Sequence, residues 1–352
     1  MRISKEFSVA LDLLRVTAAT MVFLQHANRS GRAGDILSWF TWDVGHSAVV
    51  IFFVLSGYVI ALTTSRERGP VTYGIARFSR IYSVAVPALL LTWAIDVFLV
   101  RQGIPLETGA YQLAKPQLYL PLALAFSGDL WTLSEPAMSN GPFWSLNYEV
   151  WYYVAFAALF FCSGVTRWIG SAAVFAIMGP KLLLLFPIWL GGVAVQHVHR
   201  RVMPPRGWSR VVIALSVAAF ILLKAAGIER GLDDWVLGAM GPSLTRSLGF
   251  SQWFVGDYVV GVLMMLVVFA AGGAELRLPP TAARLVTALA GLSFSLYVVH
   301  YPLLQLFSAF VPQPVGAAPV LALLCALAFG AVFEPQRHTL RRLLTMRLAP
   351  AR

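Results

Sequence analysis

Long apolar stretches recur from one end of the chain to the other, separated by short polar segments. Each stretch is close to the ~20 residues that a helix needs to cross the hydrocarbon of a bilayer. The pattern therefore predicts an all-α, polytopic membrane helical bundle of about ten transmembrane helices, built from the single domain 1–352. The expected spans are 8–27, 46–64, 81–100, 144–162, 165–180, 181–199, 209–227, 253–272, 285–308 and 315–333.

One further apolar piece, from Leu118 to Phe126, is too short to cross a bilayer unless it is extended toward the N-terminus. A re-entrant or interfacial segment is the interpretation that keeps the arginine-rich connections on one side. Counting the piece as a span would reverse the orientation of every later helix.

Composition and charge agree with a membrane protein. Hydrophobic residues make up 58% of the chain and charged residues 12%, which excludes an ordinary soluble enzyme. The net charge of +11 does not indicate nucleic-acid binding, because the basic residues gather in connections between apolar stretches. Under the positive-inside rule these connections are cytoplasmic, as are both termini. The basic clusters are Arg66, Arg68, Arg77 and Arg80; Arg200, Arg201, Arg206 and Arg210; and Arg337, Arg341, Arg342 and Arg347.

Ionisable side chains inside the predicted spans are the main functional signal, because they are costly to place in a membrane. Arg15 and His26 lie eleven residues apart, which on a helix places them about 20° apart in direction and ~16 Å apart along the axis. Asp12 is one turn from Arg15, so a structural Asp12–Arg15 ion pair is an alternative to a role in binding. The set comprises Asp12, Arg15, His26, Asp96, Glu149, Asp257 and His300.

The predicted depth of these residues divides them into two groups. His26, Glu149, Asp257 and His300 fall in the outer halves of their spans, whereas the basic residues lie toward the cytoplasm. This division predicts an anion-binding end and an acid–base end, and a histidine among carboxylates suits general-base catalysis. Sequence motifs for a serine hydrolase, a zinc protease or a nucleotide-binding loop are absent, and no metal site is expected.

Six short segments, in order along the chain, resemble the acyltransferase-3 family of bacterial membrane O-acyltransferases. The first is the Arg15-x10-His26 spacing of the first predicted helix. The others are FFVLSGY at 52–58, RFSRIY at 77–82, WSLNYEVWYY at 144–153, SLYVVHYP at 295–302 and Glu334-Pro335.

The resemblance implies an integral protein of the bacterial inner membrane that transfers an acyl group from acyl-CoA, with acetyl-CoA favoured. The donor would enter from the cytoplasm, and no tightly bound cofactor is implied. The acceptor would be a hydroxyl of a polysaccharide, a lipid-linked sugar or other glycolipid, or a macrolide. In this interpretation Arg15, Arg77 and Arg80 bind the CoA phosphates.

His26 is the predicted catalytic base, and Glu149 orients it or stabilises its charge. Arg15 is counted among the catalytic residues as well as among the donor-binding residues. His300 is the alternative base. A transporter or flippase of a polar metabolite, without acyl transfer, is the alternative function, since it would also need charges within the membrane.

Overall fold

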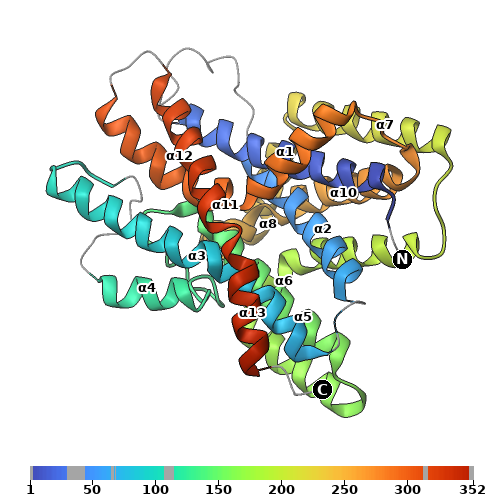
Figure 1. Cartoon of the computed structure of the whole chain (residues 1–352), viewed down its shortest axis with the longest axis horizontal. Helices are drawn as coiled ribbons and strands as arrows, with labels where there is room; N and C mark the ends of the chain where they lie inside the picture. The colour runs from blue at the N-terminus through green and yellow to red at the C-terminus, as the bar shows by residue number, and fades with distance from the viewer. Residues whose placement is uncertain are drawn as a thin grey trace. The chain divides into compact units, whose positions relative to one another are not determined.

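The structure is a computed structural model that describes residues 3–29, 44–64, 67, 69–106, 115–311 and 316–348. In these residues the regular structure consists of α-helices and two short 3-10 helices, with no strand (Figure 1). The all-α expectation is confirmed.

Eight helices of the described chain are long and apolar enough to cross a membrane. They include α1 (Lys5–Asn28), α2 (Gly45–Thr64), α3 (Pro70–Arg101) and α7 (Arg206–Ala225). The others are α6 (Gly164–His199), α10 (Phe254–Ala274, extended from Gly249), α11 (Pro280–Phe310) and α12 (Ala317–Phe333, extended into α13). The protein is therefore an integral membrane protein.

The difference between eight helices and ten predicted spans has two sources. The spans expected at 165–180 and 181–199 are two helices that meet in a kink at Gly179, where φ is 71°, and they are counted once under the label α6. Left-handed backbone is readily adopted by glycine, and Pro180 follows directly, so the sequence encodes a sharp kink at this point. The span expected at 144–162 is the helix α5 (Trp144–Phe161), which is too polar to be counted with the eight. The number ten and the side of each terminus stay predictions.

The segment between Leu118 and Phe126 forms most of the nine-residue helix α4 (Pro116–Leu124). At 1.5 Å per residue, such a helix is about 14 Å long, roughly half the thickness of the hydrocarbon. Its length supports a re-entrant or interfacial position.

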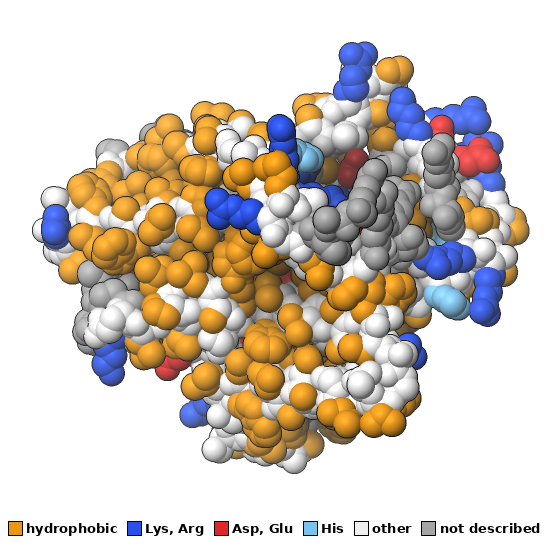
Figure 2. All heavy atoms as spheres, turned by 60° about the horizontal axis from the view of Figure 1, so that its bottom comes forward, with side chains coloured by type: hydrophobic (Ala, Val, Ile, Leu, Met, Phe, Trp, Pro, Cys, Tyr) orange, Lys and Arg blue, Asp and Glu red, His pale blue; other side chains and the backbone are white. Residues whose placement is uncertain are grey.

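Large apolar side chains lie on the outside of the helices, as a lipid-facing surface requires. Trp168 and Val165 are each 71% exposed and Leu215 is 64% exposed. Figure 2 shows hydrophobic side chains over much of the face in view, with arginines and lysines in separate groups.

The helices form two compact units that are interleaved along the sequence. Unit 1 comprises residues 1–22, 42–66 and 179–290, and unit 2 comprises residues 23–41, 67–178 and 291–352. Helices α1, α6 and α11 continue from one unit into the other. A single functional domain over 1–352 stays a prediction.

In unit 1, α10 packs against α7 and α2 (Figure 1). Short helices α8 (Ile228–Met240) and α9 (Pro242–Ser247), with the 3-10 turn η4 (Gly249–Trp253), lead into α10. In unit 2, α3 packs against α13 (Gln336–Leu348), α12, α4 and α5, while the 3-10 turn η3 (Gly141–Phe143) leads into α5.

Candidate active site

Unit 2 brings the two candidate bases into direct contact. The Nδ1 atom of His26, on α1, lies 2.9 Å from the Nε2 atom of His300, on α11. Their ring centroids are 5.0 Å apart, and the ring of Tyr301 is 5.2 Å from that of His26. His300 is fully buried, whereas His26 is partly accessible. The two histidines thus form a pair with one buried and one accessible member.

The surroundings of His300 fix the direction of the hydrogen bond in the neutral pair. The Nδ1 atom of His300 lies 3.1 Å from the carbonyl oxygen of Leu296 and 2.7 Å from that of Tyr297. Carbonyl oxygens only accept, so this nitrogen carries the proton and the Nε2 atom of neutral His300 is an acceptor. His26 must then donate through Nδ1, which leaves the lone pair of neutral His26 on its Nε2 atom. The accessible histidine is therefore the one with its basic nitrogen directed away from the pair.

A proline in the same segment explains a second contact beside His300. Pro302 has no backbone N–H, so the carbonyl of Val298, four residues earlier, lacks its usual helical donor. The side-chain amide of Asn140 donates to that carbonyl at 2.7 Å, and both residues are buried. Asn140 thereby fixes the loop before α5 against this turn of α11.

Asp96, one of the ionisable residues expected inside a span, contacts the same loop. Asp96 is fully buried on α3 and accepts hydrogen bonds from the backbone N–H and the hydroxyl of Ser139. The amide of Gln305 donates to the carbonyl of Ser139 at 3.2 Å. These contacts account for Asp96 as an anchor of the loop.

Glu149 belongs to a tyrosine network in unit 2. The hydroxyl of Tyr153 donates to Glu149 one helical turn away. The charge of Glu149 also acts on Tyr297, whose hydroxyl lies 2.6 Å from that of Ser145 and donates to the carbonyl of Pro142 at 2.8 Å. Because the ring centroid of Tyr297 is 6.0 Å from that of His300, Glu149 and the histidine pair share one polar neighbourhood.

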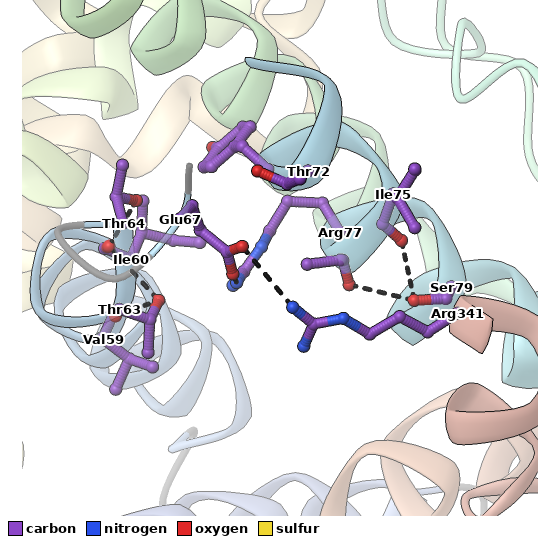
Figure 3. A network of polar contacts seen from close by, with 12 residues as sticks. Val59, Ile60, Thr63, Thr64, Glu67, Thr72, Ile75, Arg77, Ser79 and Arg341 are labelled. Atoms are coloured by element: carbon purple, nitrogen blue, oxygen red, sulfur yellow. Dashed lines mark hydrogen bonds and ion pairs between the residues drawn. The ribbon is translucent and has the colours of Figure 1, made fainter. Parts of the chain in front are cut away.

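Arg77 lies in a separate network at the start of α3, shown in Figure 3. Its Nη2 atom is 3.8 Å from Oε1 of Glu67, and Nη2 of Arg341, on α13, is 3.4 Å from Oε2 of the same carboxylate. The guanidinium of Arg77 also lies 5.5 Å from the centre of the Tyr73 ring, within the range of a cation–π contact. Arg80 is close enough to interact electrostatically with Arg77.

The last two family-like segments are joined in unit 2. Glu334 accepts hydrogen bonds from the backbone N–H and the hydroxyl of Ser295, at 3.2 and 3.1 Å. It also lies 3.9 Å from Arg337 and interacts electrostatically with Arg80. Glu334 therefore ties α11 to the end of α12 and to the basic residues near Arg77.

Arg15 belongs to unit 1, although it shares α1 with His26. Its Nη1 atom is 3.8 Å from Oδ1 of Asp12, and the hydroxyl of Thr287 donates to the other carboxylate oxygen of Asp12 at 3.1 Å. This is the contact expected from the structural alternative. The catalytic or binding roles of Arg15, His26, Glu149, Arg77 and Arg80 stay predictions.

Unit 1 also contains a histidine–carboxylate pair that the sequence did not single out. The Nε2 atom of His46 lies 3.0 Å from Oδ2 of Asp257, and the ring of Trp253 packs against that of His46 at 4.8 Å. Asp257 is buried in the first turn of α10. The sequence places His46 at the first residue of a predicted span, which marks it as a candidate polar residue but does not identify Asp257 as its hydrogen-bond partner.

Further charged groups surround this pair. Glu229, on α8, forms an ion pair with Lys224, on α7. Burial, followed by the charges of Asp257 and Glu229, raises the pKa of Asp233 from 3.8 to about 6, while His46 and Lys224 act in the opposite direction. Asp233 lies on α8, outside the candidate membrane spans.

Comparisons with known proteins agree with the resemblance seen in the six segments. The model of the acyltransferase-3 family, described as an acyltransferase domain, matches residues 8–333. An O-acetyl transferase of Shigella phage Sf6 is 24% identical over 245 residues, which cover 64% of this chain and 72% of that protein. Protein 2 in the picA locus of Rhizobium radiobacter is 31% identical over 162 residues, covering 40% of this chain and 76% of that protein. No solved structure is significantly similar to the chain.

Proposed function

The chain belongs to the acyltransferase-3 family, and from this membership we propose that it transfers an acyl group from acyl-CoA to an acceptor hydroxyl. The protein is a membrane acyltransferase. The favoured donor is acetyl-CoA, because the phage relative is an O-acetyl transferase. The acceptor class is a carbohydrate, a glycolipid or a macrolide, and the membrane is the bacterial inner membrane.

The observation that carries this proposal is the His26–His300 pair. In our mechanism, Nε2 of His26 accepts the proton of the acceptor hydroxyl while its oxygen attacks the carbonyl carbon of the thioester. The carbon–sulfur bond then breaks, and the CoA sulfur leaves with the proton held by His26. His300 is assigned as a positioning residue, because its Nδ1 contacts set the tautomer of the pair.

The charge that develops on His26 needs a nearby anion. Glu149 is assigned this role, since its charge already acts on Tyr297 beside His300. Arg77 and Arg80 are assigned to the phosphates of the donor, because a charge-assisted contact from arginine suits phosphate geometry. Arg15 is also assigned to bind the acyl-CoA donor.

The decisive experiment measures release of the CoA thiol from acetyl-CoA, with the acetyl group passing to water or to an added hydroxyl acceptor, by purified protein in detergent, where no membrane gradient exists. The wild-type protein should release CoA, whereas a transporter would not. His26→Ala should insert and fold but lose about 100- to 10,000-fold in turnover, as expected for loss of a general base. Turnover of wild type should rise with pH between about 5 and 8, and this limb should vanish in His26→Ala.

His300 variants supply the contrast. His300→Gln keeps a side-chain amide that can accept from His26, so it should retain more activity than His300→Ala. Loss of one such positioning contact should cost about 10- to 100-fold in turnover, less than loss of the base itself. If His300→Ala is the more damaged variant and loses the pH-dependent limb, the base is His300. A folded His26→Ala protein with near wild-type turnover would refute the mechanism.

A further inference from the structure

Two arginines from distant parts of the sequence meet at one carboxylate in unit 2. Arg77 contacts Oε1 of Glu67 at 3.8 Å, and Arg341 contacts Oε2 at 3.4 Å (Figure 3). Arg77 comes from the first turns of α3, and Arg341 from the middle of α13. The packing of α13 along α3 makes this meeting possible. A single group with two anionic oxygens therefore fits between the two guanidinium groups.

The two arginines differ in accessibility in a way that suits a binding site. Arg77 is held, with 12% of its side chain exposed, between Glu67 and the ring of Tyr73. Arg341 has 51% of its side chain exposed and can meet a ligand from solvent. A guanidinium carries five N–H donors, and the contact of Arg341 with Glu67 uses one nitrogen.

The charge balance around this point favours an anion. Arg80 and Arg337 both interact with Glu334, so the described residues of this neighbourhood include four arginines and two glutamates, an excess of positive charge. Phosphate groups, with three oxygens and up to two negative charges, match paired guanidinium groups better than a single carboxylate does.

We propose that Arg341 completes, together with Arg77, the binding site for a phosphate group of the acyl-CoA donor. The inference rests on the proposed function and adds the C-terminal helix α13 to the donor site. It explains why the last basic cluster of the chain folds back onto α3. An anionic lipid headgroup offers the same phosphate chemistry and is the competing ligand.

The test measures CoA binding to the purified full-length protein in a neutral detergent without added lipid, by isothermal titration calorimetry. Arg341→Ala should weaken CoA binding by about tenfold, the lower end of the value for a charge-assisted contact, because the side chain is half exposed. Arg341→Lys should recover part of the loss. Arg342→Ala, which removes the same charge from the next exposed position of α13, should stay within about twofold of wild type.

Each other outcome counts against a specific statement. Equal CoA affinity in Arg341→Ala and wild type would overturn this inference while leaving the proposed function intact. Equal losses in Arg341→Ala and Arg342→Ala would indicate general charge attraction and would also overturn it. If Arg341→Ala changes only the thermal stabilisation produced by phosphatidylglycerol in nanodiscs, the site belongs to a lipid. A wild-type protein that binds no CoA would reject the proposed function itself, and this site with it.

Discussion

Substituting Gly57 tests whether the FFVLSGY segment acts through close helix packing. A Cβ atom added at Gly57 would lie 2.0 Å from the backbone oxygen of Trp189, and one added at Gly192 would lie 2.0 Å from the backbone oxygen of Val54. The two glycines therefore let α2 and the second half of α6 approach backbone to backbone. Small residues are the usual means of such approach in membranes. The hydroxyl of Ser56 receives a hydrogen bond from the Trp189 indole at 3.1 Å across the same contact.

Two opposing terms set the expected effect of Gly57→Ala. Replacing glycine by alanine inside a helix gains about 1 kcal/mol in helix propensity. Relieving a 2.0 Å contact requires the helices to separate by over ~1 Å, since ordinary contacts begin near 3.4 Å, and overpacking typically costs about 1 to 3 kcal/mol or more. Backbone atoms cannot rotate aside as a side chain can, so the upper part of that range applies. The net loss should be about 1 to 2 kcal/mol.

Thermal unfolding of the purified protein in detergent measures this loss. Gly57→Ala should lower Tm by roughly 1 to 3 °C, because the entropy of unfolding of a 352-residue chain is large. Gly74→Ala is the matched control, because Gly74 lies inside α3 with nothing within 4 Å of an added Cβ. The control should keep or slightly raise Tm. A Gly57→Ala protein with the Tm of wild type would show that the helices are not in this close contact.

Three further predictions concern charge and orientation. Asp233 has its pKa raised from 3.8 to about 6, so its favourable contribution to stability is complete below about pH 3.8 and is lost as pH rises through 6. Asp233→Asn should therefore have a higher Tm than wild type at pH 7.5 and lose this advantage near pH 4, and an advantage independent of pH would contradict the assignment. Arg15→Ala should raise KM for acyl-CoA or abolish activity, whereas Asp12→Asn should keep donor affinity; unchanged KM and turnover in Arg15→Ala would leave only the ion pair with Asp12. In a variant without the native cysteines, a cysteine at Glu135 should react with an impermeant maleimide from outside and one at Arg206 should not, and the reverse pattern would overturn the predicted orientation.

The helices could be predicted from the sequence because their length and apolar content follow from the thickness of a bilayer. The sequence also indicates the break within α6. Gly179 and Pro180 indicate a sharp turn, and two helices meet there in a kink at Gly179. The helix α5 shows the limit of this reasoning. It carries Asn147 and Glu149 in its first half, so it is too polar to be counted with the candidate spans.

The candidate site was only partly predictable, for a physical reason that differs from residue to residue. His26 and His300 were both identified as possible bases, yet their contact joins positions 274 residues apart. Arg341 was assigned to a basic cluster because charge clustering is visible in sequence, whereas its shared carboxylate with Arg77 depends on how α13 packs. The contact between His46 and Asp257 could not be predicted, because no sequence motif links the two segments.

The spacing within the SLYVVHYP segment follows from the two faces of α11. At 100° per residue, Ser295 and Pro302 lie about 20° apart on one face, while Tyr297 and His300 lie about 60° apart on the other. Ser295 packs against Gly330 of α12, and its hydroxyl donates a hydrogen bond to Glu334. This face therefore attaches α11 to α12. Tyr297 forms a hydrogen bond with Ser145, in the first turn of α5, and His300 forms one with His26, on α1. A helix that binds its successor on one side and contacts Ser145 and His26 on the other needs both sets of residues at these offsets, which is why the segment has a recognisable pattern.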